Sequence, residues 1–254
     1  MEELLRALVT LGIASLLCLL RLEAATFRAA EYDEPSADGR ASTFRLRMGW
    51  YVLGLSLVVA ALVIHPAPAS DLLLGLGDRA GAILGGFALG AIGTGQAVLF
   101  ARRRYARLRI PPLWSYPDAM LNALGTALID EATFRGLILG FLLLAGIDPT
   151  LAIIAQALLY VLATRTAAPG RSPYVFALAL WMGLAAGWLT AVTGGIGAAF
   201  LGHAVTRIAV FVCTGHAGQP AARGHEAEDS WEYRRSPDGW RQAERPGEEA
   251  RADR

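Results

Sequence analysis

The chain of 254 residues contains no lysine, only four histidines and only two cysteines. Cys18 and Cys213 lie near the ends of separate apolar segments, so they indicate neither a disulfide framework nor a cysteine metal cluster. Charged residues make up 18% of the chain, and the net charge is only +1. Such a small net charge gives no electrostatic reason to expect a nucleic acid as partner.

Apolar residues are abundant instead, at 54% of the chain, and the mean hydropathy is +0.41. This composition is too apolar for an ordinary soluble domain and indicates a polytopic membrane protein. A transmembrane helix needs about 20 mostly apolar residues. The sequence therefore predicts an all-α membrane helix bundle with about seven transmembrane helices, over residues 4–20, 50–64, 80–100, 119–144, 149–164, 174–192 and 196–213.

The positions of the arginines predict the orientation of these helices. Arginines gather in alternate connections, which by the positive-inside rule lie in the cytoplasm, and Arg79 is the exception. The N-terminus is then outside and the C-terminus inside. The first segment begins with MEELLRAL, which is acidic rather than basic, so we expect an uncleaved anchor. The arginines used are Arg21, Arg28, Arg40, Arg45 and Arg47, the run ARRRYARLR at 101–109, Arg165, Arg171, Arg223, Arg234 and Arg235.

Composition divides the chain into three parts. Residues 1–115 hold three predicted helices with polar cytoplasmic loops, residues 116–214 hold four more, and residues 215–254 form a polar tail. Glycines four residues apart occur in GFALG (86–90), GLILG (136–140) and GLAAG (183–187). Small residues at this spacing let helices approach closely in lipid, so these glycines predict helix packing rather than function.

Ionisable residues nevertheless occur inside two predicted spans. The stretch LIDEATFRGL contains Asp130, Glu131 and Arg135, and LGHAVTRIAVF contains His203 and Arg207. Each formal charge costs roughly 2.5–3.5 kcal/mol at the centre of a membrane helix, so four cost on the order of 10 kcal/mol before pairing. Glu131 and Arg135 share a helix face, as do His203 and Arg207. One interpretation is a functional site, and the other is an ion-pair network that fixes helix register.

Three motifs together give a resemblance to a known family. Residues 130–136 read D-E-ATF-R-G, residues 183–194 read GLAAGWLTAVTG, and His203 follows in the next apolar segment. This pattern resembles the CPBP, or CAAX-type, intramembrane proteases, which include type II prenyl endopeptidases and bacterial Abi proteins. The resemblance covers about residues 117–213. It implies a membrane endopeptidase, in the inner membrane if the protein is bacterial, with residues 116–214 as its catalytic core.

The sequence departs from the family pattern at three positions. Asp130 replaces a glutamate, Thr164 stands where a histidine is expected four residues after Tyr160, and Arg207 replaces an asparagine. The resemblance implies a metal site or a water-activating site. Only Glu131 and His203 remain as ligands if zinc is bound, so a site of two histidines and one carboxylate is not visible. Tyr160 and Thr164 are then candidates for substrate binding.

Three hypotheses follow, and the sequence does not decide whether the protein is an enzyme. The first is an endopeptidase that hydrolyses a membrane protein or lipidated peptide, with Glu131 as base, Arg135 as its partner, and His203 and Arg207 as oxyanion donors. The second is a catalytically inactive scaffold or partner-binding protein of the same family. The third is a transporter whose acids handle protons or a cation. A water-sized cavity between Glu131 and His203 would favour catalysis, whereas a direct Glu131–Arg207 pair would favour the scaffold.

Overall fold

A computed structural model describes residues 2–27, 29, 40–105, 108, 110, 117–167 and 173–214. Within these ranges the structure is helical and contains no strand. The predicted all-α membrane fold is therefore confirmed. The elements are α1 (Glu2–Leu22), η1 (Glu23–Ala25), α2 (Arg40–Ile64), α3 (Pro68–Asp71), α4 (Arg79–Tyr105), α5 (Pro117–Glu131), η3 (Ala132–Ile138), α6 (Leu139–Leu144), α7 (Pro149–Ala167), α8 (Pro173–Thr193) and α9 (Gly197–Thr214).

Several of these helices have the length and composition needed to cross a membrane. Four segments qualify, namely Leu4–Ala25, Arg45–Ile64, Arg79–Arg103 and Phe176–Thr193, and Pro149–Thr164 and Gly197–Cys213 are shorter apolar helices. The remaining predicted span is built from three pieces, α5, η3 and α6. Many leucine and valine side chains are exposed, including Val63 at 78% and Leu84 at 71%, as expected for helices that face lipid. The count of seven crossings stays a prediction.

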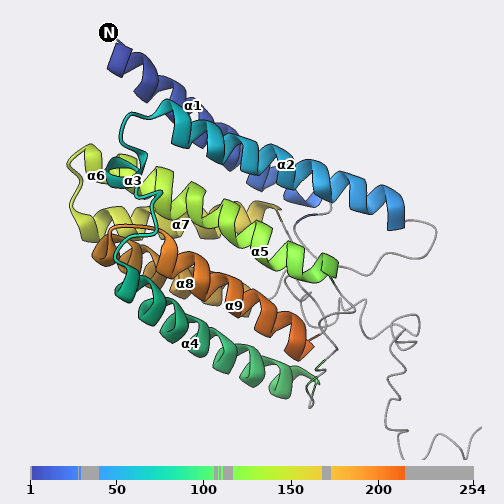
Figure 1. Cartoon of the computed structure of the whole chain (residues 1–254). Helices are drawn as coiled ribbons and strands as arrows, with labels where there is room; N and C mark the ends of the chain where they lie inside the picture. Colours follow the sequence, from blue (N-terminus) through green and yellow to red (C-terminus); the bar gives the residue numbers. More distant parts are fainter. Residues whose placement is uncertain are drawn as a thin grey trace, which may run out of the picture.

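The helix that carries the DEATFRG motif lies in the middle of the bundle. Helix α5 packs against α2 on one side and α9 on the other, while α4 packs along the far side of α9 (Figure 1). Helix α1 contacts α2, η3 and α7. The motif is thus enclosed by helices from both halves of the chain, which removes its side chains from lipid as well as from water.

Two of the three pairs of closely spaced glycines lie at helix–helix contacts, as predicted, and the third pair, Gly136 and Gly140, packs against the end of α3 and the chain that follows it. A methyl group on any of these glycines would press against a neighbouring element, so each contact depends on the missing side chain. The observed neighbours are Leu201 and Val205 for Gly86 and Gly90, Leu74 and Leu72 for Gly136 and Gly140, and Ala157 and Gln156 for Gly183 and Gly187. Glycine spacing therefore sets the approach of α4 to α9 and of α7 to α8.

Several arginines that were predicted to lie in connections belong to helices instead, and two of them are buried. Arg21 is in the last turn of α1 and Arg47 is in α2, and they are only 3% and 4% exposed. They are therefore weak indicators of sidedness. Arg28, Arg165, Arg171 and the tail arginines lie outside the described side chains, as does part of the run at 101–109. The orientation of the bundle stays a prediction.

Candidate functional site

The backbone changes its helical form immediately after Glu131. Helix α5 ends there, and residues Ala132–Ile138 continue as a π-helix before α6 begins. The Thr133 hydroxyl donates a hydrogen bond of 2.7 Å to the Ile129 carbonyl at this transition. Short π-helical segments are rare and occur frequently at functional sites. The wider turn determines where Arg135 lies relative to Glu131.

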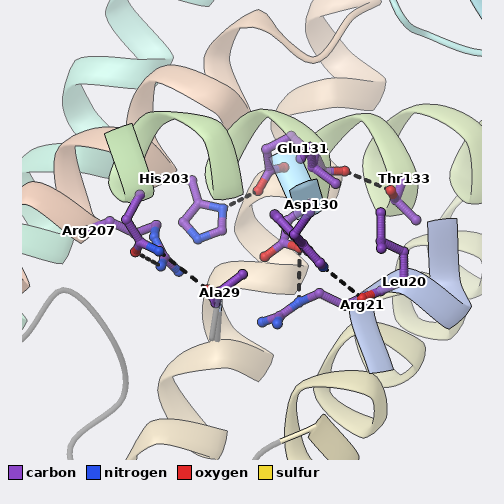
Figure 2. Close-up of polar contacts among 11 residues, drawn as sticks. Leu20, Arg21, Ala29, Asp130, Glu131, Thr133, His203 and Arg207 are labelled. Atoms are coloured by element: carbon purple, nitrogen blue, oxygen red, sulfur yellow. Dashed lines mark hydrogen bonds and ion pairs between the residues drawn. The ribbon is translucent and has the colours of Figure 1, made fainter. Parts of the chain in front are cut away.

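Glu131 is the centre of the buried polar cluster and is 0% exposed. Its Oε1 lies 2.6 Å from Nδ1 of His203 (Figure 2), and its Oε2 forms a 3.3 Å ion pair with Nε of Arg135. The contact with His203 is in hydrogen-bonding range, whereas the Arg135 pair lacks hydrogen-bond geometry. The predicted meeting of these three residues is therefore observed, with α9 supplying the histidine to the motif helix.

Tyr160 supports both partners of Glu131. The guanidinium carbon of Arg135 lies 4.2 Å from the centre of the Tyr160 ring, a cation–π arrangement. The centres of the Tyr160 and His203 rings are 6.3 Å apart in an edge-on arrangement, and the centres of the Phe134 and Tyr160 rings are 5.2 Å apart. Tyr160, predicted from the resemblance as a substrate-binding residue, thus orients the cluster from α7.

Asp130 reaches a different partner from its neighbour Glu131. Its Oδ1 lies 3.0 Å from Nε of Arg21, and both side chains are almost fully buried (Figure 2). The sequence does not predict this pair, because the position of Arg21 after the first apolar segment is typical of a cytoplasmic loop. The expected balance of two acids by two arginines is present, but the second arginine is Arg21 from α1.

Arg207 is held by a residue that the sequence analysis missed. Its Nη2 donates a 2.8 Å hydrogen bond to Oδ1 of Asn122 on α5. The amide nitrogen of Asn122 donates to the Tyr51 hydroxyl at 2.8 Å and to the Ala29 carbonyl at 3.3 Å. A single asparagine inside an apolar helix could have predicted this contact, because a buried side-chain amide needs hydrogen-bond partners. Asn122 links α9, α2 and the chain after α1.

Thr164 is buried at 1% exposure, one helical turn after Tyr160. Its hydroxyl has no hydrogen-bond partner among the described residues. A catalytic zinc site uses three protein ligands, and within the described ranges no group of three His, Cys, Asp or Glu side chains could hold a metal. Glu131 and His203 offer two donors, and a threonine hydroxyl is a poor third. The residues therefore do not fit a zinc site.

Residues 112–209 match the model of a family described as type II CAAX prenyl endopeptidase Rce1-like. This part of the chain is similar to that family and is called the Rce1-like region below. The match confirms the predicted resemblance, and it includes Glu131, Arg135, Tyr160 and His203. Arg21 lies outside the Rce1-like region, residues 112–209. No significant match is found among curated proteins or among solved structures.

The Rce1-like region places an acid, a histidine and an arginine in a setting shielded from water and lipid. The ion pairs Glu131–Arg135 and Asp130–Arg21 bring the formal charges of these four residues to zero. Pairing lowers the cost of keeping them at membrane depth, although it does not make them a source of net stability. The carboxylate of Glu131 can accept a proton, and the imidazole of His203 can donate or accept one.

Proposed function

We propose that the protein is an intramembrane endopeptidase of the CAAX type that uses Glu131 to activate water. The observation that carries the proposal is the 2.6 Å contact between Glu131 Oε1 and His203 Nδ1, in an Rce1-like region. A general base must lie within hydrogen-bonding reach of its proton, and apo geometry tightens or rearranges when substrate binds. Membrane-associated proteins are the substrate class that the family suggests.

The two residues can divide the steps of peptide hydrolysis. Water beside Glu131 gives a proton to the carboxylate, and the resulting hydroxide attacks the peptide carbonyl carbon. The Nδ1–H of His203, released from Glu131, then donates to the oxyanion. When the C–N bond breaks, protonated Glu131 returns its proton to the leaving amine, so the products are a carboxylic acid and an amine. Arg135, fixed by Tyr160, keeps Glu131 oriented, and Arg207 is a second candidate oxyanion donor.

The test is a cleavage assay with full-length protein in liposomes. The substrates are single-span membrane proteins and farnesylated peptides that end in a free carboxylate. Glu131→Gln should lower the cleavage rate by about 10²- to 10⁴-fold, the usual contribution of a general base. Glu23→Gln, at an exposed position in η1, is the matched control and should cleave normally. Undiminished cleavage by folded Glu131→Gln protein would end the proposal.

A second candidate function is that of an inactive scaffold that binds partner proteins. Thr164 favours it, because a threonine stands where the family resemblance leads us to expect a histidine. The cluster is then structural, and Glu131→Gln should leave the cellular phenotype intact while the stability of the protein falls. A phenotype lost at unchanged stability would contradict the scaffold. Neither of the two geometries that would separate these functions is present among the described residues. Glu131 contacts His203 directly at 2.6 Å, which leaves no room for a water molecule between them. Arg207 donates its described hydrogen bond to Asn122 rather than to Glu131.

The membrane placement is proposed together with the function. We infer that the bundle lies in a bacterial inner membrane with its N-terminus outside and its C-terminus in the cytoplasm. A membrane-impermeant thiol reagent applied to intact cells checks this orientation. It should label a cysteine introduced at Glu2, at the start of α1, but not one introduced after residue 214. The reverse labelling pattern would overturn the orientation.

A further inference from the structure

The first helix meets the candidate site although it lies outside the Rce1-like region. Arg21 is in the last turn of α1, and its Nε is 3.0 Å from Oδ1 of Asp130. Asp130 is the residue immediately before Glu131. An arginine this deeply buried, at 3% exposure, is costly to place unless its charge is matched by a partner.

The chain around Arg21 is fixed by two further hydrogen bonds. The indole Nε1 of Trp50, on α2, donates to the Leu20 carbonyl at 2.8 Å. The amide of Asn122, on α5, donates to the Ala29 carbonyl at 3.3 Å. Trp50 and Asn122 are both 0% exposed, so these bonds are shielded from water. The end of α1 is therefore held at a defined position against the motif helix, and Arg21 has little freedom to move.

We propose that Arg21 is a positioning residue for the site, which acts by holding Asp130 away from the partners of Glu131. The contacts show a division: Asp130 is paired with Arg21, while Glu131 is paired with Arg135 and His203. Adjacent buried carboxylates repel each other and compete for the same cations. Arg21 removes Asp130 from that competition and leaves Glu131 as the single carboxylate at His203.

Loss of Arg21 should therefore disturb His203 through Asp130. Without its partner, Asp130 is an unpaired carboxylate in the interior, one residue from Glu131. The described groups that would attract it are Arg207, whose charge interacts with that of Asp130, and the partners of Glu131, namely Arg135 and His203. Removing the Asp130 charge as well takes away the competitor, so the second substitution should reverse the effect of the first. A purely structural role of Arg21 predicts no such effect at His203.

The first experiment measures cleavage by full-length protein in liposomes and rests on the proposed function. Arg21→Gln should lower kcat about tenfold or more with little change in KM, because even a displacement of about 1 Å at a site residue can cost on the order of 10²-fold in rate. Adding Asp130→Asn should restore most of kcat, and Arg21→Lys should retain part of it. Arg6→Gln is the matched control, since Arg6 is on the same helix but exposed and paired with Glu2.

The second experiment does not depend on cleavage. The histidines are labelled with ¹⁵N in nanodisc-embedded protein, and the His203 signals are identified by their loss in His203→Gln. Arg21→Gln should shift the His203 imidazole signals, Arg21→Gln with Asp130→Asn should return them towards their original positions, and Arg6→Gln should leave them unchanged. If His203 signals and cleavage are both unaffected in folded Arg21→Gln protein, the proposal is wrong. Shifted signals in a protein that cleaves nothing would support the role of Arg21 and count against the endopeptidase instead.

Discussion

The Glu131–Arg135 pair permits a quantitative prediction about stability. Glu131→Gln keeps the shape of the side chain but removes its charge. Arg135, which is 1% exposed, then remains as a buried cation whose nearest described support is the Tyr160 ring at 4.2 Å. The amide oxygen of the new glutamine can still accept a hydrogen bond from one neighbour. The change therefore isolates the charge of Glu131 from its packing.

The expected loss follows from these contacts. Removing one partner of a buried ion pair typically costs 3–5 kcal/mol, and a hydrogen bond to a charged group contributes about 1.5–3 kcal/mol. The Arg135 pair is long, at 3.3 Å, and the amide preserves part of the 2.6 Å contact with His203. We therefore expect the free energy of unfolding to fall by about 3 kcal/mol, near the lower end of that range. Adding Arg135→Gln removes the unpaired cation, so the double variant should be less destabilised than the sum of the single variants, with a coupling of about 0.5–3 kcal/mol.

The assay is reversible unfolding in mixed micelles, with the fraction of denaturing detergent as the variable and tryptophan fluorescence as the signal. The set comprises the natural protein, the two single variants, the double variant and Glu23→Gln as exposed control. Both single variants should unfold at a lower detergent fraction, and Glu23→Gln should match the natural protein. A change below about 0.5 kcal/mol for Glu131→Gln, the size typical of surface substitutions, would refute this account of the pair.

Further predictions follow from the other contacts. Asn122→Leu leaves the guanidinium of Arg207 without its amide partner, so the same unfolding assay should show a loss of about 3 kcal/mol; an unchanged midpoint would contradict the network. Gly90→Ala presses a methyl group against α9 and should cost about 1–3 kcal/mol, whereas Gly95→Ala in the same helix meets open space and should be neutral or stabilising. Equal effects of the two alanines would show that α4 and α9 do not pack as described. If Thr164 occupies the position of the family's histidine, Thr164→His should add a third ligand beside Glu131 and His203 and give zinc uptake that chelator competition can measure. No uptake by the folded variant would contradict the assignment of Thr164 to that position.

The parts of the site that the sequence predicted are those that depend on short spacing or on a motif. Glu131 and Arg135 are four residues apart, which places two helical side chains on one face, and they are in contact. His203 was identified by its place in the family pattern, and it meets Glu131 across 72 residues of chain. Glycine spacing predicted close packing because a glycine has no side chain, so a neighbouring segment can approach its backbone.

The parts that were missed depend on tertiary structure. Arg21 near the end of an apolar segment has the composition of a cytoplasmic flank, and only the packing of α1 against η3 brings it to Asp130. The Arg207–Asn122 hydrogen bond joins residues 85 positions apart, and no helical spacing in the sequence predicts it. The π-helix at Ala132–Ile138 has no residue preference that distinguishes it from an α-helix in the sequence. Each of these three features depends on which helix surfaces pack together in the folded protein.

The arrangement of charges bears on the choice between enzyme and scaffold. Buried ion pairs contribute little net stability compared with apolar residues, so stability alone does not explain four charges at membrane depth. Register could explain the Asp130–Arg21 pair, because it joins α1 to the motif helix. Fixing the register of the helices does not require a charge on His203, because Arg135 already matches the charge of Glu131. His203 nevertheless lies 2.6 Å from Glu131, where it supplies a hydrogen bond to the buried carboxylate and can also exchange a proton with it. The Glu131–His203 contact is therefore compatible with both a structural cluster and the proposed enzyme, and the cleavage assay of Glu131→Gln separates the two.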